Sequence, residues 1–250
     1  MAAPRFLLAI PAYNEERYLE GVLRQARTRI DDILVVDDGS TDRTRQILAA
    51  QPDLRVVRHA TNLGYGRTLA DAFNYAVQAD FNWLITMDCD EQHEPAFIPR
   101  FVAAARRGDA DLISGSRYLV GLEGDSAGPT DRRLINARIT ELLNERLDLG
   151  ITDAFCGFKA YRVSALCQLA VTEPGYAMPL QVWVQAARAG MRIVELPVPL
   201  IYNDADRRFG GGLDEPATRY QYYVDVLEAA LGRSTWPAPP DEVEAVRIAS

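Results

Sequence analysis

The chain of 250 residues is poor in lysine, cysteine and histidine, and each shortage narrows its possible functions. Lys159 is the only lysine, so 26 of the 27 basic residues are arginine, whose planar guanidinium suits bidentate contact with phosphate. The three cysteines lack Cys-x-x-Cys spacing, which argues against a disulfide framework and a structural zinc site. His59 and His93 are the only histidines, and no neighbouring pattern gives them zinc-ligand spacing.

Long apolar runs are missing as well. No stretch approaches 18 apolar residues, and the run at residues 6–10 is too short for a signal peptide and is followed by no small-residue cleavage site. We therefore expect a reduced, cytoplasmic protein without a transmembrane segment, and we leave peripheral contact with the cytoplasmic face of a membrane open. The net charge of −8 argues against nucleic acid as a partner.

Three common nucleotide and hydrolase motifs are also absent. The chain has no Gly-x-Ser-x-Gly element and no Gly-Lys-Ser/Thr element, so an α/β-hydrolase and a P-loop NTPase have no support. Pro11 and Tyr13 stand where a dinucleotide-binding turn would need glycines.

Short apolar segments alternate with helical patterns over the first half of the chain. The predicted strands are residues 6–10, 33–37, 54–58, 83–87 and 112–114. Nearly continuous apolar strands are typical of a parallel sheet that is covered on both faces. The alternation predicts an α/β fold with a Rossmann-like, doubly wound, mostly parallel sheet flanked by helices, in one domain of residues 1–232.

The second half is less regular. We expect helices at residues 132–147, 180–189 and 220–231, an edge or terminating strand at 191–198, and a flexible glycine loop at 210–212. The apolar stripe of the last helix is expected to pack on the domain, because the helix lacks the basic face of a membrane anchor. The proline-containing tail, residues 233–250, is expected to be weakly ordered.

Polar clusters follow the predicted strands. They occupy residues 11–15, 37–40, 62–64, 88–90 and 115–117. Because ligands in such sheets bind beyond the carboxyl ends of the strands, we expect all five clusters to open onto one crevice.

Asp88 and Asp90 are the candidate metal ligands. The sequence has two other Asp-x-Asp pairs, at residues 109 and 111 and at 204 and 206, but only this one directly follows an apolar strand at the predicted crevice. Paired carboxylates suit Mg²⁺ or Mn²⁺ whose shell is completed by substrate phosphates, although an exposed acidic turn is the alternative. We expect His93 to form a hydrogen bond beside this loop and Cys89 to be a buried spacer.

These residues carry a family resemblance. Pro-Ala-Tyr-Asn-Glu-Glu at 11–16, Asp-Asp-Gly-Ser-Thr-Asp at 37–42, Asn-Leu-Gly at 62–64, Asp-Cys-Asp-Glu-Gln-His at 88–93 and Gly-Ser-Arg-Tyr at 115–118 occur in the order found in inverting family 2 glycosyltransferases. The chain most resembles the dolichol- or polyprenyl-phosphate mannose synthase branch. The likeness continues through Asp-Ala-Phe-Cys-Gly-Phe-Lys at 153–159 and covers about residues 5–212.

The resemblance implies a GT-A fold that transfers a sugar from a nucleoside diphosphate sugar. It assigns the donor nucleotide to Pro11, Tyr13, Glu15, Asp38 and Gly64, and the divalent metal with the diphosphate to Asp88, Asp90 and Gln92. It assigns phosphate contacts to Arg117, Arg132, Arg133 and Arg207. Among these residues Asp90 and Arg117 would take part in catalysis, because a leaving diphosphate builds negative charge that cations stabilise.

The acceptor stays open at this point. A phosphate acceptor is ionised and needs no base, whereas a hydroxyl on a soluble acceptor needs one, for which Asp153 is the candidate, with a structural turn aspartate as the alternative. Cys156, Gln181 and Leu213 depart from the branch pattern, which expects serine, glutamate and lysine at these positions. They leave room for a third hypothesis, a non-catalytic module that binds a nucleotide sugar.

Overall fold

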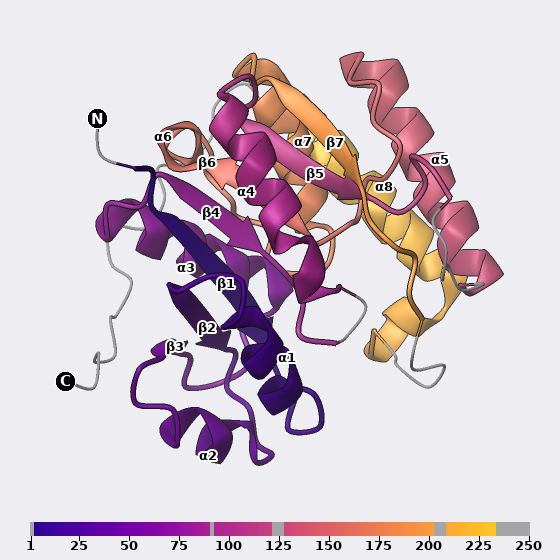
Figure 1. The fold of residues 1–250 in the computed structure, drawn as a ribbon. Helices are drawn as coiled ribbons and strands as arrows, with labels where there is room; N and C mark the ends of the chain where they lie inside the picture. The colour runs from indigo at the N-terminus through magenta and orange to yellow at the C-terminus, as the bar shows by residue number, and fades with distance from the viewer. Residues whose placement is uncertain (1–2, 91–92, 122–127, 203–208, 234–250) are drawn as a thin grey trace.

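The computed structural model describes residues 3–90, 93–121, 128–202 and 209–233, and the helices and strands named below lie within these ranges (Figure 1). In chain order the elements are β1 (Phe6–Ala12), α1 (Leu19–Ala26), β2 (Ile33–Asp37), α2 (Thr44–Ala49), β3 (Arg55–Arg58), α3 (Tyr65–Gln78), β4 (Trp83–Thr86), η1 (Pro95–Phe97), α4 (Ile98–Arg107), β5 (Leu112–Ser116), α5 (Thr130–Leu147), β6 (Lys159–Arg162), α6 (Val163–Leu166), α7 (Met178–Arg188), β7 (Ile193–Pro197), η2 (Gly211–Asp214) and α8 (Pro216–Gly232).

The strands form one mixed sheet. The described residues give seven strands in the order β3-β2-β1-β4-β6-β5-β7. β6 runs antiparallel to both of its neighbours, and the other paired strands are parallel. The prediction of a doubly wound, mostly parallel α/β sheet is confirmed, and β7 is an edge strand, as is β3.

Strand β6 was not predicted from the sequence. Its four residues, Lys-Ala-Tyr-Arg, begin and end with a charged side chain and do not form an apolar run. Tertiary context overrides that pattern: Lys159 is buried and donates to Ser114 Oγ at 2.7 Å, and the Arg162 guanidinium lies 4.9 Å from the Trp83 ring centroid. Burial that is compensated by a hydrogen bond and a cation–π contact explains how charged residues occupy a central strand.

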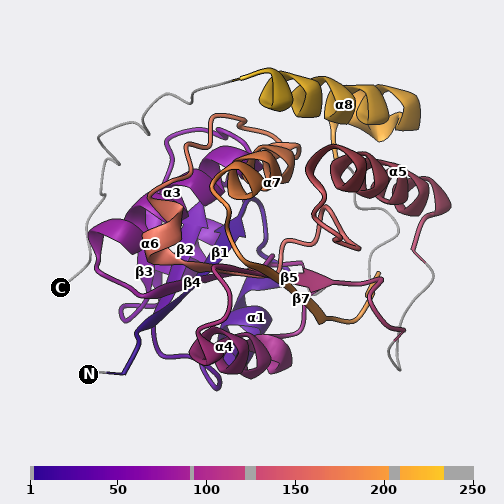
Figure 2. The same ribbon diagram turned by 90° about the horizontal axis from the view of Figure 1, so that it is seen from above.

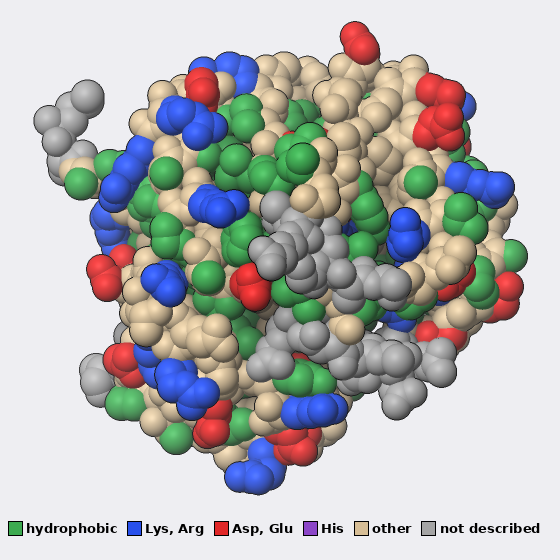
Figure 3. All heavy atoms as spheres, turned by 45° about the vertical axis from the view of Figure 1, so that its right-hand side comes forward, with side chains coloured by type: hydrophobic (Ala, Val, Ile, Leu, Met, Phe, Trp, Pro, Cys, Tyr) green, Lys and Arg blue, Asp and Glu red, His purple; other side chains and the backbone are tan. Residues whose placement is uncertain are grey.

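Helices cover both faces of the sheet in layers. Figure 2 shows α3, α5, α7 and α8 on one side and α1 and α4 on the other. Strand β1 contributes to both cores, because Leu7 and Ala9 pack in the cluster under α3 and α7 while Leu8 and Ile10 pack in the cluster under α1 and α4. On the face in Figure 3, acidic and basic side chains are interspersed rather than gathered by sign.

The later elements agree with the predictions except at their ends. The predicted helices at 132–147, 180–189 and 220–231 are α5, α7 and α8, each of which begins two to four residues earlier. The predicted glycine loop is wrong in part, because Gly211 and Gly212 begin the short helix η2. Helix α4 was not predicted. The tail from residue 234 lies outside the described residues, and no described helix is long and apolar enough to cross a membrane.

Candidate active site

A cavity of about 580 Å³ lies at the carboxyl ends of the strands. Each of the five polar clusters predicted from the sequence contributes to its wall. The lining residues from these clusters are Pro11, Ala12, Tyr13, Glu15, Asp38, Asn62, Gly64, Asp88, Cys89, Asp90 and Arg117. The crevice expected from the sheet topology is therefore present.

The turn after β1 is locked to the turn after β2. Asn14 has a positive φ of 56°, and its side-chain Oδ1 accepts from the backbone N–H of Thr41 at 2.8 Å. Asn14 N–H donates to Ser40 Oγ at 3.0 Å, and Glu15 N–H donates to Thr44 Oγ1 at 2.8 Å. Asparagine tolerates this left-handed conformation better than other residues, so the sequence encodes a rigid edge of the cavity.

Asp38 organises the next loop. Its Oδ1 accepts from Leu63 N–H at 2.8 Å, and its Oδ2 accepts from Gly64 N–H at 2.9 Å. Gly64 has φ of 99°, and a Cβ there would lie 2.4 Å from the carbonyl oxygen of Pro174. Only glycine fits this backbone conformation and this close approach.

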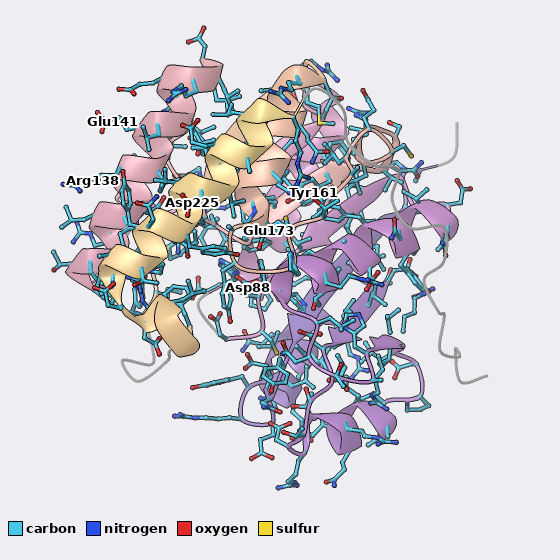
Figure 4. All side chains as sticks on the ribbon, turned by 180° about the vertical axis from the view of Figure 1, so that it is seen from behind. Asp88, Arg138, Glu141, Tyr161, Glu173 and Asp225 are labelled. Carbon is cyan, nitrogen blue, oxygen red and sulfur yellow. The ribbon has the colours of Figure 1, made fainter. Side chains whose placement is uncertain are left out.

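Asp88 lies at the end of β4, between the N-terminal strands and helix α8 (Figure 4). The Tyr65 hydroxyl donates to Asp88 Oδ1 at 3.0 Å, and the Asp88 N–H donates to His93 Nδ1 at 3.1 Å. A Cβ at Gly157 would lie only 2.3 Å from Asp88 Oδ2, so the glycine leaves room for this carboxylate. His93 thus forms the hydrogen bond expected beside the loop, and Cys89 is buried as expected.

The donor set on this side fits a hard divalent cation. Asp88 and Asp90 both line the cavity, and burial together with the Asp88 carboxylate raises the pKa of Tyr65, so its hydroxyl stays a donor to Asp88. Among the described residues, no group of three acidic, His or Cys side chains is arranged so that it could hold a metal ion by itself. Two carboxylates suffice for Mg²⁺ or Mn²⁺ when substrate phosphates and water supply the remaining oxygens. Gln92, the third predicted ligand, lies outside the described residues.

Arg117 and Asp153 form a buried bidentate ion pair. Arg117 Nε donates to Asp153 Oδ2 at 2.7 Å, and Arg117 Nη2 donates to Oδ1 at 2.9 Å. Asn136 Nδ2 adds a third side-chain bond to Oδ1 at 2.8 Å. Burial opposes the charged form of Asp153, but the Arg117 guanidinium outweighs it and holds the pKa of this carboxyl at about 2.

The contacts of Asp153 favour a structural role over that of a general base, the two alternatives that the sequence left open. Its side chain is fully buried, does not line the cavity, and uses both oxygens to hold Arg117 and Asn136. A carboxylate with so low a pKa is a poor proton acceptor near neutral pH. The structure supports the alternative in which Asp153 is structural, because it orients Arg117 at the cavity wall.

The other predicted arginines have different positions. Arg132 lines the cavity, with its guanidinium 4.7 Å from the ring centroid of Phe209. Arg133 is exposed and does not line the cavity, and its predicted contact with phosphate stays a prediction. Successive residues on an α-helix point about 100° apart, so Arg133 points in a different direction from Arg132. Arg207 lies outside the described residues.

The sequence did not reveal the aromatic wall of the cavity. Tyr65 stacks on Tyr176 with ring centroids 5.7 Å apart, and Tyr176 meets Phe209 edge to face at 5.3 Å. Phe155 packs on Tyr223 at 4.6 Å. These aromatic residues come from distant parts of the chain. The sequence pointed only to Tyr65, which follows Gly64, and to Phe155, which lies two residues after Asp153.

Two of the three departures from the branch pattern make side-chain contacts, and the third, Leu213, makes a backbone contact. Gln181 Oε1 accepts from the N–H groups of Thr172 and Glu173, both at 2.9 Å, so it holds a loop that leads into the cavity wall. Cys156 is buried, with its Sγ 3.8 Å from His93 Nε2. The carbonyl of Leu213 accepts from Arg219 at 2.8 Å.

The fold is that of GT-A glycosyltransferases. Solved structures of glucosyl-3-phosphoglycerate synthase from Mycobacterium tuberculosis are similar over most of the chain. The complex with Mg²⁺ and uridine diphosphate gives a TM-score of 0.71 at 20% identity, covering 93% of this chain and 81% of that one. The complex with Mn²⁺, uridine-diphosphate-glucose and phosphoglyceric acid gives 0.68 at 21% identity, with the same coverage.

Sequence comparison then identifies the family. The model of the family described as Glycosyl transferase family 2 matches residues 8–169. The undecaprenyl-phosphate mannosyltransferase of Micrococcus luteus is 32% identical over 220 residues, which cover 84% of this chain and 89% of that protein. The chain belongs to glycosyl transferase family 2 and is a glycosyltransferase.

Proposed function

We propose that this glycosyltransferase moves a sugar, with inversion, from a nucleoside diphosphate sugar to a polyprenyl phosphate. One observation carries the proposal: a single cavity holds the carboxylates Asp88 and Asp90 beside one group of loops and the guanidinium groups of Arg117 and Arg132 beside another. Two anionic partners, a diphosphate and a phosphate, fit this pairing of a metal-ligand set with fixed cations.

The donor occupies the side built from the first four strands. Pro11, Tyr13, Glu15 and Asp38 contact the nucleoside, and the rigid turn at Gly64 brings backbone close to it. Asp88, Asp90 and Gln92 hold Mg²⁺ or Mn²⁺, which supplies positive charge to the leaving diphosphate. Tyr65 orients Asp88 through its hydroxyl, and His93 fixes the backbone of the same loop.

The acceptor occupies the other side. Arg117, Arg132 and Arg207 meet its phosphate, which is ionised at neutral pH and attacks without a base. The engagement of Asp153 with Arg117 supports this choice, because it removes the base that a hydroxyl acceptor would need. Ile135, Phe155 and Phe209 offer apolar surface next to the arginines, which suits a prenyl chain and brings the enzyme to the cytoplasmic face of a membrane.

The donor half of the proposal is tested by a thermal-shift panel of nucleoside diphosphates with Mn²⁺. A ligand that binds only the folded protein raises its melting temperature, and one base should give a larger shift than the others. A panel without any shift would contradict a donor site in this cavity.

The acceptor half is tested by transfer assays with the preferred sugar nucleotide. A short polyprenyl phosphate should become glycosylated, and the unphosphorylated alcohol should not. Transfer to phosphoglyceric acid or to a simple hydroxyl in its place would contradict the lipid acceptor and restore the soluble-acceptor hypothesis. Binding without transfer over the whole panel would favour the non-catalytic alternative.

A further inference from the structure

A chain of four charged side chains lies behind the donor loop. His59 Nδ1 is 2.6 Å from Asp38 Oδ1, and His59 Nε2 is 2.8 Å from Asp71 Oδ2. Arg67 Nε donates to the same Asp71 Oδ2 at 2.8 Å and forms the outer end of the chain. His59, Asp38 and Asp71 are 8%, 3% and 2% exposed, so three of the four groups are shielded from water.

The geometry fixes the protonation of His59. Each imidazole nitrogen faces an oxygen of an ionised carboxyl group, which can only accept a hydrogen bond. Both nitrogens must therefore carry a proton, and the ring is an imidazolium. Burial lowers the pKa of His59, but the hydrogen bonds and charges of Asp38 and Asp71 outweigh burial and raise the pKa to about 9.

The positive charge of the His59 ring offsets the negative charge of its carboxylate partners. With His59 protonated, the four groups carry two positive and two negative charges, and loss of that proton leaves an excess buried negative charge. Asp71 Oδ1 has no hydrogen-bond partner among the described residues, so Asp71 depends on Oδ2 and the two cations there. Arg58 is paired separately with Asp37, with Arg58 Nε 2.8 Å from Asp37 Oδ2, and does not replace the charge of His59.

Asp38 links the charge of His59 to the wall of the cavity. Its two oxygens accept from the N–H groups of Leu63 and Gly64, and Oδ1 is shared with His59. An Asp38 carboxylate released from the imidazolium would move or bind its loop less tightly, because two buried carboxylates would then repel each other across a neutral ring. The donor loop therefore depends on a group that does not itself line the cavity.

We propose that His59 is a positioning residue whose positive charge holds Asp38 against the Leu63–Gly64 loop and thereby sets the affinity for the donor nucleotide. The inference rests on the proposed donor site. It predicts that loss of the charge weakens nucleotide binding and raises KM for the donor, with kcat largely retained, because Asp88, Asp90 and Arg117 are untouched.

The test is the pH dependence of nucleotide affinity, measured by calorimetric titration of the full chain with Mn²⁺ and uridine or guanosine diphosphate from pH 6 to pH 10. Wild-type affinity should stay level to about pH 8.5 and fall above it. In Asp71→Asn, which removes one carboxylate from His59, the fall should begin about one pH unit lower. Titration of the ligand is common to both proteins and cancels in this comparison.

Two further variants complete the test. His59→Gln should bind the nucleotide about tenfold more weakly at pH 7, without the alkaline fall that begins near pH 9 in the wild type. Asp111→Asn is the matched control: Asp111 also pairs with arginines, Arg162 and Arg192, but away from the cavity, so its profile should match the wild type. If His59→Gln does not fold, the positioning role is tested by the difference in pH dependence of nucleotide affinity between the wild type and Asp71→Asn.

The outcomes separate the two proposals. Equal pH profiles for wild type and Asp71→Asn, or undiminished binding by His59→Gln, overturn the positioning role and leave the donor site intact. A wild type that binds neither diphosphate at any pH contradicts the proposed function instead. Protonation of the ring has its own readout, because the His59 Cε1 proton should not shift in NMR spectra below about pH 8.

Discussion

The two sides of the cavity, which we call the donor side and the acceptor side after the proposed function, are built in different ways. On the donor side, neighbouring loops after parallel strands bind each other through short-range contacts, such as Asn14 to Thr41 and Asp38 to Gly64. On the acceptor side, Arg117, Arg132 and the aromatic wall come from β5, α5 and loops around α7 and α8, and a buried ion pair holds the key cation. The donor side follows from the sheet itself, whereas the acceptor side depends on how helices pack onto it.

This difference has a consequence for divergence within the family. The strand-end loops must keep their residues because each one holds the backbone of the next. Helix surfaces can change one side chain at a time without altering the sheet. We therefore expect the acceptor to be the more variable property of such enzymes, and the following predictions test the contrast from the largest effect to the smallest.

The largest effect is expected where the acceptor side depends on one buried pair. Arg117→Met leaves Asp153 buried without its cation and should lower the free energy of unfolding by about 3–5 kcal/mol. Urea denaturation followed by circular dichroism measures this. Arg133→Met, at an exposed position on α5, is the control and should change stability by less than about 0.5 kcal/mol. Equal stabilities would mean that the pair does not hold the acceptor side together.

The next effect concerns chemistry on the donor side. Asp90→Ala should lower kcat by about 10²–10³-fold without unfolding the protein, because it removes one electrostatic contact to the metal and diphosphate. Steady-state transfer rates at saturating donor measure the loss. Asp109→Ala removes a carboxylate from an exposed turn and should keep full activity. Near-normal turnover of Asp90→Ala would remove the metal site from the mechanism.

The two sides should lose stability at opposite ends of the pH scale. On the acceptor side, the pKa of Asp153 lies at about 2, below its usual 3.8, so the stability it contributes is present above pH 3.8 and is lost as pH falls toward 2, amounting to about 2 kcal/mol. On the donor side, the pKa of His59 is raised from 6.5 to about 9, so its contribution is present below pH 6.5 and is lost as pH rises through 9.

Free energies of unfolding in urea between pH 2.5 and pH 9.5 measure both losses. Asp153→Asn should flatten only the acid side of the curve, and His59→Gln only the alkaline side. A variant that flattens both ends would show that the two sides are coupled, contrary to their separate hydrogen-bond networks.

The smallest effect tests a contact that joins the two sides. Tyr65 donates to Asp88 and stacks on Tyr176 of the acceptor wall. Tyr65→Phe keeps the stacking and removes the hydroxyl, so the Mn²⁺ concentration for half-maximal activity should rise about tenfold while the acceptor KM stays the same. A change in the acceptor KM alone would assign Tyr65 to the acceptor side.

The sequence predicted the sheet and the strand-end residues that line the cavity for one physical reason. Apolar runs such as residues 33–37 identify buried parallel strands directly, and ligand sites in these sheets follow the strand ends. Asp38, Gly64 and Asp88 could thus be assigned to the cavity from their positions alone. Strand β6 was not predicted because Lys159 and Arg162 are stabilised there by residues that are distant in the sequence.

The acceptor side could be predicted less well, because contacts between distant parts of the chain position its residues. Arg132 and Arg133 are equivalent in sequence, and only the orientation of α5 decides which one faces the cavity. The role of Asp153 depends on its burial beside Arg117 and Asn136, which no local pattern encodes. The family resemblance indicated the two arginines and Asp153. The contacts that distinguish a base from a structural carboxylate come from tertiary packing.

The position of β6 between β4 and β5 also determines the order in which the sheet can form during synthesis. Strands β1 to β4 pair with one another using only residues 6–86. Among the described residues, strand β5 pairs only with β6 and β7, which are made later. At least 43 residues must follow residue 116 before β5 gains a partner. The nucleotide side of the enzyme can therefore take shape on the ribosome while the acceptor side is still unpaired chain.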